Sequence, residues 1–163
     1  MASGDTLIIF HPYNNEPPAA NYATLDLRNY HPCLVFAKTA NQSAVVTGIM
    51  PRNYAGGGVT VYIHWTAATD TTDTHHCYWD AAFEAMVAQD IDSDGFAAVN
   101  SNDTTHPNAT SGIPTITDIA FTDGADMDSV AAGGIFRLQI TRDAANDDMT
   151  GTAQALGIEI KET

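Results

Sequence analysis

Segments in which apolar and polar residues alternate recur along the chain, and Gly, Pro, Asn and Asp separate them. The clearest segment, residues 59–66, directly follows three glycines. Its apolar side chains share one face: Val59, Val61, Ile63 and Trp65. Because successive side chains of a β-strand point to opposite faces, this period of two predicts a half-buried strand. The same alternation predicts strands at 76–87, 135–142 and 153–161.

Weaker alternation adds strands at 6–10, 25–27, 33–37, 43–50 and 115–121. No stretch keeps a helical period beyond about two turns, so the pattern predicts an all-β protein. Roughly eight or nine strands, joined by loops of varied length, suit a two-sheet β-sandwich of jelly-roll type. The length fits a single jelly-roll domain spanning residues 1–163.

Two segments depart from this pattern. Residues 11–22 hold three prolines among asparagines, which predicts an irregular, extended N-terminal arm over a neighbouring subunit or a plain surface loop. Residues 126–131 predict a short helical turn, with Asp123 or Asp126 as its cap.

The charge of the chain narrows the classes of partner. Six Lys and Arg stand against twenty Asp and Glu, a net charge of -14, and no segment gathers basic residues. Binding of nucleic acid depends on Lys and Arg that displace counterions from phosphates, so a nucleic-acid partner is not expected. Partners that are neutral, cationic or bridged by metal ions fit this charge better.

The sequence also bears on where the protein works. No run approaches the roughly 18 apolar residues of a membrane span, and residues 1–5 lack the basic and apolar regions of a signal peptide. We therefore expect no membrane partner and no classical leader. A virion or another extracellular assembly, released for example by lysis, is the expected location.

Cys33 and Cys77 are the only two cysteines, too few for a disulfide framework and too far apart for a CxxC site. The sequence predicts two buried thiols, and a single disulfide between two strands is the alternative.

His75 and His76 precede Cys77 and form a run of metal-ligating residue types. Neighbours on a strand point to opposite faces, so they rarely share one ion. A zinc site would need a further ligand such as His64 or His106, and strand or loop residues at a sheet edge are the simpler interpretation.

Asp90, Asp92 and Asp94, followed by Gly95, match the first half of a calcium-binding loop. Position twelve of such a loop is Ser101 rather than the usual Glu, and no helices flank it. Calcium bound in a β-sandwich loop, with help from Asp103 or carbonyl groups, is one hypothesis. A solvated acidic turn is the other.

No catalytic signature is present. Nothing resembles a nucleophile elbow or a Cys-His pair, and the three glycines at 56–58 do not open a helix as a phosphate loop does. We therefore do not expect an enzyme or a resident cofactor, apart from calcium. The aromatic residues on apolar faces are expected in the core: Trp65, Trp79, Phe83, Phe121 and Phe136. Tyr62 and Tyr78 lie on polar faces, where they could stack on sugar rings.

Residues 51–67, from Pro-Arg-Asn-Tyr through the glycines into the strand, are followed by Trp79 and Phe83. Together with 133–142, the Asp-rich loop 143–148 and the final strand, this order resembles small structural proteins of tailed phages. The resemblance covers most of the chain. It implies a jelly-roll virion component that works as a homo-oligomer.

These observations lead to one principal functional hypothesis and two alternatives. The principal one is a structural virion protein, of the capsid decoration, fibre or tail-associated kind, that assembles as a trimer or larger and contacts other virion proteins. The first alternative is a subunit of an extracellular tube or filament. The second is a calcium-assisted carbohydrate-binding module that uses the loop 90–103 with Tyr62 or Tyr78.

Overall fold

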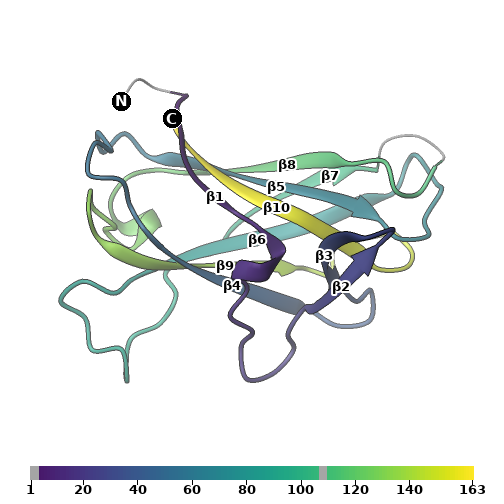
Figure 1. The fold of residues 1–163 in the computed structure, drawn as a ribbon, viewed down its shortest axis with the longest axis horizontal. Coiled ribbons are helices and arrows are strands. Elements are labelled where there is room, and N and C mark those ends of the chain that lie inside the picture. Colours follow the sequence, from purple (N-terminus) through teal and green to yellow (C-terminus); the bar gives the residue numbers. More distant parts are fainter. Residues whose placement is uncertain (1–3, 107–109) are drawn as a thin grey trace.

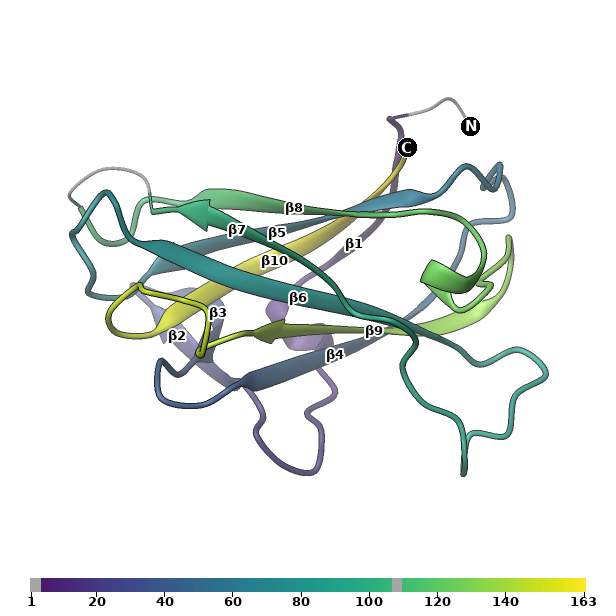
Figure 2. The ribbon, with the colours of Figure 1, turned by 180° about the vertical axis from the view of Figure 1, so that it is seen from behind.

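Ten antiparallel strands form two stacked sheets in the computed structural model, within the residues that it describes, 4–106 and 110–163 (Figures 1 and 2). The first sheet consists of β1 (Thr6–Phe10), β2 (Thr24–Arg28), β3 (His31–Phe36), β5 (Val59–Ala67), β8 (Thr115–Phe121) and β10 (Ala153–Glu162). The second consists of β4 (Gln42–Ile49), β6 (His76–Ala85), β7 (Asn100–Thr105) and β9 (Ile135–Arg142), in the order β4-β9-β6-β7. The predicted two-sheet, all-β sandwich is confirmed.

The core lies between the sheets and is built from the predicted apolar faces. Trp65 of β5 and Trp79 of β6 are fully buried, with ring centroids 6.2 Å apart. Phe36 meets Trp79 edge-on at 4.9 Å, and Phe83 meets Phe121 in the same way at 4.9 Å. All five aromatic residues predicted to be core are at most 3% exposed. Edge-to-face packing of this kind adds to the large apolar area that each ring buries.

The sequence did not predict β7, because Asn100–Thr105 contains no apolar residue. Its inward side chains bond instead to the free edge of β8: the amides of Asn100 and Asn102 donate to the carbonyls of Ala120 and Asp118, at 2.8 and 2.7 Å. Figure 2 shows β7 and β8 side by side at this border of the sandwich. Polar side chains thus close one side of the sandwich.

The opposite side is closed by the chain before β2. The amide of Ala23 donates to the carbonyl of Ser43 on β4, and the chain then crosses into β2 of the other sheet. Within 11–22, a short 3₁₀ helix, η1 (Pro12–Asn14), precedes Glu16, whose amide donates to Val45 of β4. Within 11–22, Glu16 and Asn21 are therefore bonded to β4 of their own chain.

Arg142, at the end of β9, points inward and is fully buried. Its guanidinium binds both carboxylate oxygens of Asp147, with Nε to Oδ2 at 2.7 Å and Nη2 to Oδ1 at 3.0 Å. It also donates to the carbonyls of Phe36, Met149 and Gly151. Burial alone would raise the pKa of Asp147, but the bonds from Arg142 outweigh it and lower that pKa. This pair fastens the loop after β9 to the sandwich.

The predicted helical turn at 126–131 is wrong in its extent and its caps. The structure has a 3₁₀ helix, η2 (Ala125–Met127), that begins after Gly124 without a side-chain cap. Asp128 and Ser129 both have positive φ, 51° and 60°, and this left-handed backbone ends the helix. No helix of the described residues has the length and apolar character to cross a membrane.

Cys33 and Cys77 are both buried and both carry free thiols. The interpretation as two buried thiols is confirmed, and the alternative of a disulfide between them is wrong. Cys77 points into the core beside β9, while Cys33 lies on β3 of the other sheet. Burial raises the pKa of both thiols, which keeps them in the unreactive protonated form.

Candidate functional site

A hollow of about 430 Å³ lies on the outer face of the first sheet, at the point along β10 where its neighbouring strand changes from β3 to β1. On one side of β10, β3 pairs with Ala153–Ala155 and β1 takes over from Ile158 onward. The register of β10 against β5 also shifts between Ala155 and Gly157, which marks a β-bulge. We call this hollow the β10 groove; it is lined by Ile9, His11, His64, Pro114, Leu156, Gly157, Ile158 and Glu159.

Two polar groups face one another in the β10 groove. Nε2 of His64, on β5, lies 3.7 Å from Oε2 of Glu159, on β10. The other carboxylate oxygen, Oε1, accepts a hydrogen bond from the hydroxyl of Thr6 on β1. Three neighbouring strands thus place a hydroxyl, a carboxylate and an imidazole in one row.

Tyr62 extends this polar surface along β5. It is the cross-strand neighbour of Glu159 on one side and of exposed Asp118 on the other. The ammonium of Lys161 lies 5.6 Å from the centroid of the Tyr62 ring, a cation-π contact. This contact fixes the ring at the surface of the sheet.

Apolar side chains lie among these polar groups. Ile9 is 58% exposed and Ile116 is 46% exposed, although both lie on strands. Leu156 and Pro114 also line the groove, as does Gly157, which has no side chain. The surface is therefore mixed, with apolar patches beside hydrogen-bonding groups, as is common in small-molecule sites.

The order of these groups does not fit nucleophilic catalysis. A catalytic hydroxyl needs the imidazole next to it as the base, with the carboxylate behind the imidazole. Here the carboxylate of Glu159 lies between the hydroxyl of Thr6 and His64. The groove thus offers hydrogen-bonding groups beside apolar surface.

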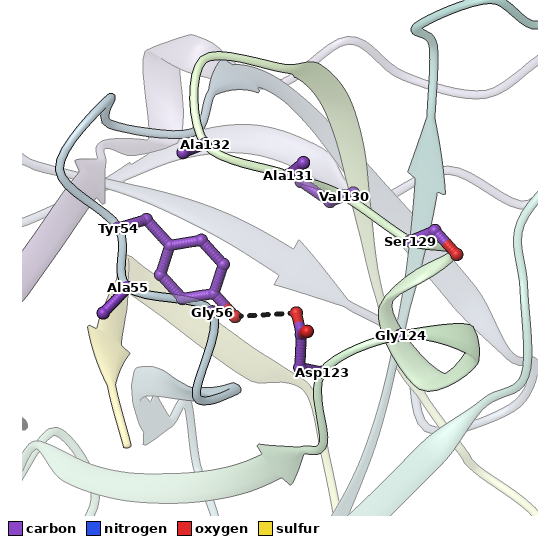
Figure 3. Close-up of a pocket in the computed structure, with 9 residues that line it drawn as sticks. All are labelled: Tyr54, Ala55, Gly56, Asp123, Gly124, Ser129, Val130, Ala131 and Ala132. Carbon is purple, nitrogen blue, oxygen red and sulfur yellow. Dashed lines mark hydrogen bonds between the residues drawn. The ribbon is translucent and has the colours of Figure 1, made fainter.

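A second hollow, of about 320 Å³, lies at one end of the sandwich between Tyr54 and residues 129–132 (Figure 3). The hydroxyl of Tyr54 donates to Oδ1 of Asp123 at 3.2 Å and accepts the amide of Gly58 at 3.0 Å. Glu162 accepts the amide of Ala55 at 2.6 Å. Because these bonds hold residues 54–58 to β10 and the β8–η2 connection, the polar groups here are used for structure.

The residues of the calcium hypothesis lie in the loop between β6 and β7. The carboxylate of Asp90 accepts the amide of Asp92 at 3.1 Å, and its carbonyl accepts the amide of Asp94. No three His, Cys, Asp or Glu side chains of the described residues are grouped as metal ligands. The turn needs no ion for these bonds, and calcium binding by Asp90, Asp92 and Asp94 stays a prediction.

Tyr62 and Tyr78 lie on the outer faces of different sheets, as their polar faces indicated. Tyr78 is the cross-strand neighbour of Asp103 on β7, whereas the loop with Asp90, Asp92 and Asp94 joins the opposite ends of β6 and β7. Tyr62 lies on the far side, in line with the β10 groove. Only one of the two tyrosines can therefore contribute to any one site.

The run 75–77 does not gather around one point. His75 bonds to Asp70 at 2.7 Å, His76 bonds to Asp103 at 2.5 Å, and Cys77 points into the core. His106 is 1% exposed against Trp65, at 6.3 Å between ring centroids. His64 is on the other sheet, so the interpretation as strand and loop residues fits this placement.

The pair of Asp70 and His75 predicts a stability maximum in mildly acidic solution. Burial would raise the pKa of Asp70, but bonds from His75, Thr72 and Thr150 hold it well below the ordinary range. Its stabilisation is therefore lost as the pH falls below the unfolded value of about 3.9. The bond to Asp70 raises the pKa of His75. That contribution is complete below about pH 6.5 and is lost as the pH rises through the raised value.

We expect the urea midpoint to be highest between about pH 4 and 6.5. The Asp70→Asn variant should lose the decline that wild type shows above pH 6.5, because His75 then lacks its ion partner. His76→Gln serves as the control, since His76 is more exposed and bonds to the exposed Asp103. An unchanged decline in Asp70→Asn would contradict this assignment.

Comparisons with known proteins bear on the fold. No model of a known protein family matches the chain, and no curated protein does. The family 11 carbohydrate-binding module from Clostridium thermocellum, solved with a β-1,3-1,4-mixed-linked tetrasaccharide, is 8% identical over 100% of this chain and 98% of its own, with a TM-score of 0.50. A xylan-binding module is 9% identical over 96% of this chain and 97% of its own, with a TM-score of 0.49. A module described for mannan recognition is 9% identical over 99% and 100%, with a TM-score of 0.48.

At these identities the similarity concerns the fold alone. The family 11 module matches over all of this chain and 98% of its own, and this agrees with the jelly-roll class inferred from the strand pattern. The chain therefore shares its two-sheet β-sandwich with this module.

Proposed function

We propose that this protein is a carbohydrate-binding module that holds a neutral oligosaccharide or polysaccharide in the β10 groove. The observation that carries the proposal is the groove itself, which places apolar surface and hydrogen-bonding groups together on an outer sheet face. The proposal takes up one alternative from the sequence and moves its site from the loop 90–103 to the face that bears Tyr62.

The chemistry of a sugar ring fits this surface. A pyranose has C–H faces that pack against apolar or aromatic side chains and hydroxyls at its rim that exchange hydrogen bonds. Ile9 and Ile116 supply exposed apolar area, and Tyr62 lies between them on the sheet. His64 and Glu159 supply a donor or acceptor and an acceptor within 3.7 Å of each other.

The extent of the face also suits a chain of sugars. From β1 across β10 and β5 to β8 there are three interstrand spacings, roughly 14 Å in all. Polar groups occur on each of these strands: Thr6, Glu159, Tyr62, His64 and Asp118. A short oligosaccharide laid across the strands would meet several of them.

Charge selects the class of sugar. The net charge of -14 repels anionic polymers such as uronates or sulfated glycans. Within the site, Glu159 and Asp118 would lie close to any bound acid group. Neutral glucans, xylans, mannans or galactans are therefore the expected ligands. The shared fold with a module solved with a β-1,3-1,4-mixed-linked tetrasaccharide supports this class by analogy.

We expect Tyr62→Ala to weaken binding to the best neutral polysaccharide by about five- to tenfold, because loss of one stacking contact removes roughly 1 to 1.4 kcal/mol. Binding is measured by affinity electrophoresis over a panel of soluble polysaccharides and then by calorimetry. Tyr78→Ala is the matched control: it removes a similarly half-exposed tyrosine from the outer face of the other sheet.

The two tyrosine variants separate the possible sites. Equal affinity of Tyr62→Ala and wild type, with loss in Tyr78→Ala, would move the site to the second sheet. Repeating the measurement with calcium and with chelator tests the contribution predicted for Asp90, Asp92 and Asp94. Absence of binding to every neutral polysaccharide of the panel would contradict the proposal.

A second candidate function, the self-assembling virion protein or filament subunit, is favoured by one observation. The β2–β3 hairpin exposes Leu25 by 47%, Leu27 by 56% and Tyr30 by 90%. The carboxylate of Asp26 accepts a hydrogen bond from the amide of Leu27 at 2.7 Å, so this amide is not available to pair with a further strand. A second copy would therefore contact the exposed side chains of Leu25, Leu27 and Tyr30 rather than extend the sheet. Light scattering tests it: a trimer or larger assembly, broken by Leu27→Asp, supports this function, and a monomer at high concentration contradicts it.

A further inference from the structure

The β10 groove brings together three side chains of the types that bind transition metals. His11 follows β1, His64 lies on β5 and Glu159 lies on β10, and all three line the same hollow. These residues are far apart in the sequence and form no motif, so only the pairing of the strands assembles them.

Two of the three groups already have the spacing of ligands on one ion. A tetrahedral zinc ion binds histidine nitrogen and carboxylate oxygen at about 2.1 Å, which leaves the two ligand atoms roughly 3.4 Å apart. Nε2 of His64 and Oε2 of Glu159 are 3.7 Å apart, too far for a direct hydrogen bond and close to this spacing.

Thr6 orients the carboxylate for this purpose. Its hydroxyl donates to Oε1 of Glu159, which leaves Oε2 directed at His64. Metal sites in proteins depend on such outer hydrogen bonds to fix the first ligands.

His11 completes the set from the other side of β10. Phe10 pairs with Ile158, and His11 continues in extended conformation, with φ −97° and ψ 163°, so one further step places it beside Gly157. His64 pairs with Gly157 from β5. The two histidines therefore flank a residue without a side chain, with backbones two interstrand spacings, about 10 Å, apart. His11 is exposed to solvent.

We propose that His11, His64 and Glu159 form a zinc site in the β10 groove, with the fourth position open toward the groove. Two imidazoles and one carboxylate suit zinc and its neighbours in the first transition series, whereas calcium and magnesium prefer oxygen ligands alone. The negative net charge raises the local concentration of cations. In this structure, no three His, Cys, Asp or Glu side chains of the described residues are grouped closely enough to hold one ion. Zinc binding therefore includes a movement of the His11 side chain toward His64 and Glu159. The site goes beyond sugar binding and does not depend on it.

The test is calorimetric titration of zinc chloride into the full chain, prepared without a histidine tag and stripped with chelator. We expect one zinc per chain. His11→Ala and His64→Ala should each weaken binding by more than the 10- to 100-fold typical of losing an outer-shell partner, and Thr6→Val by about tenfold. Glu159→Gln should weaken binding as well, because the neutral amide is a poor zinc ligand.

His76→Ala is the matched control, since His76 is also half-exposed beside a carboxylate, on the other sheet. Full zinc affinity in His76→Ala, with loss in His11→Ala and His64→Ala, supports the site. Loss of zinc only in His76→Ala, or no stoichiometric binding by wild type, overturns it. Sugar binding is measured separately in chelator, so failure of the zinc site and failure of the carbohydrate proposal give different results.

Discussion

Replacing Arg142 by methionine should lower the free energy of unfolding by about 3 to 5 kcal/mol, the loss typical when one partner of a buried ion pair is removed. Arg142 and Asp147 both have fully buried side chains, and the bidentate bonds between them are 2.7 and 3.0 Å long. Without the guanidinium, the charge of Asp147 stays buried, and three carbonyl groups lose their donor.

The measurement is urea unfolding of wild type and variant, followed by tryptophan fluorescence. Lys38→Met is the matched control, because the ammonium of Lys38 contacts the same carboxylate from a side chain that is 31% exposed. We expect this control to lose about 1 kcal/mol or less, as partly exposed pairs do. A loss in Arg142→Met no larger than in Lys38→Met would contradict the role given to Arg142.

Replacing Trp65 by alanine should also cost about 3 to 5 kcal/mol of unfolding free energy. Trp65 is fully buried at the centre of the core, beside Trp79 and His106. The interior cannot collapse around so large a loss, because β5 is held between β8 and β10. Chemical unfolding of the variant measures the effect, and a loss below about 1.5 kcal/mol, the range of volume-conserving core changes, would contradict this packing.

The two tryptophans provide a finer comparison. Nε1 of Trp65 donates to the hydroxyl of buried Thr117 at 2.9 Å, whereas Nε1 of Trp79 has no partner in the described part of the chain. Trp65→Phe should therefore cost about 1 kcal/mol more than Trp79→Phe, since only the first substitution removes a hydrogen bond. Equal losses would show that the bond to Thr117 contributes nothing net.

Much of the fold could be predicted from the alternation of apolar residues. This signal works where one face of a strand meets the core, as in β5, β6 and β9. It fails for β7, whose inward side chains bond to the backbone of β8 instead of packing in the core. An asparagine-rich strand of this kind has the composition of a loop, so composition alone misassigns it.

The candidate site could be predicted only in part. The sequence placed Tyr62 and His64 on one polar face, and the structure agrees. It could not show that His11 and Glu159 join them, because that depends on the pairing of β1 and β5 with β10 and on the bulge near Gly157. The aspartates 90, 92 and 94 drew attention because their spacing matched a known loop, a local signal that needs no knowledge of pairing.

The central claim is that the outer face of the first sheet binds a neutral sugar chain. The most direct test is to follow the backbone amide resonances of the labelled protein during titration with the oligosaccharide that corresponds to the best polysaccharide of the panel. The account predicts shifts around the β10 groove, at residues such as Ile9, Tyr62, His64 and Glu159, with little change near Tyr78. Shifts confined to the second sheet, or none at all, would contradict it.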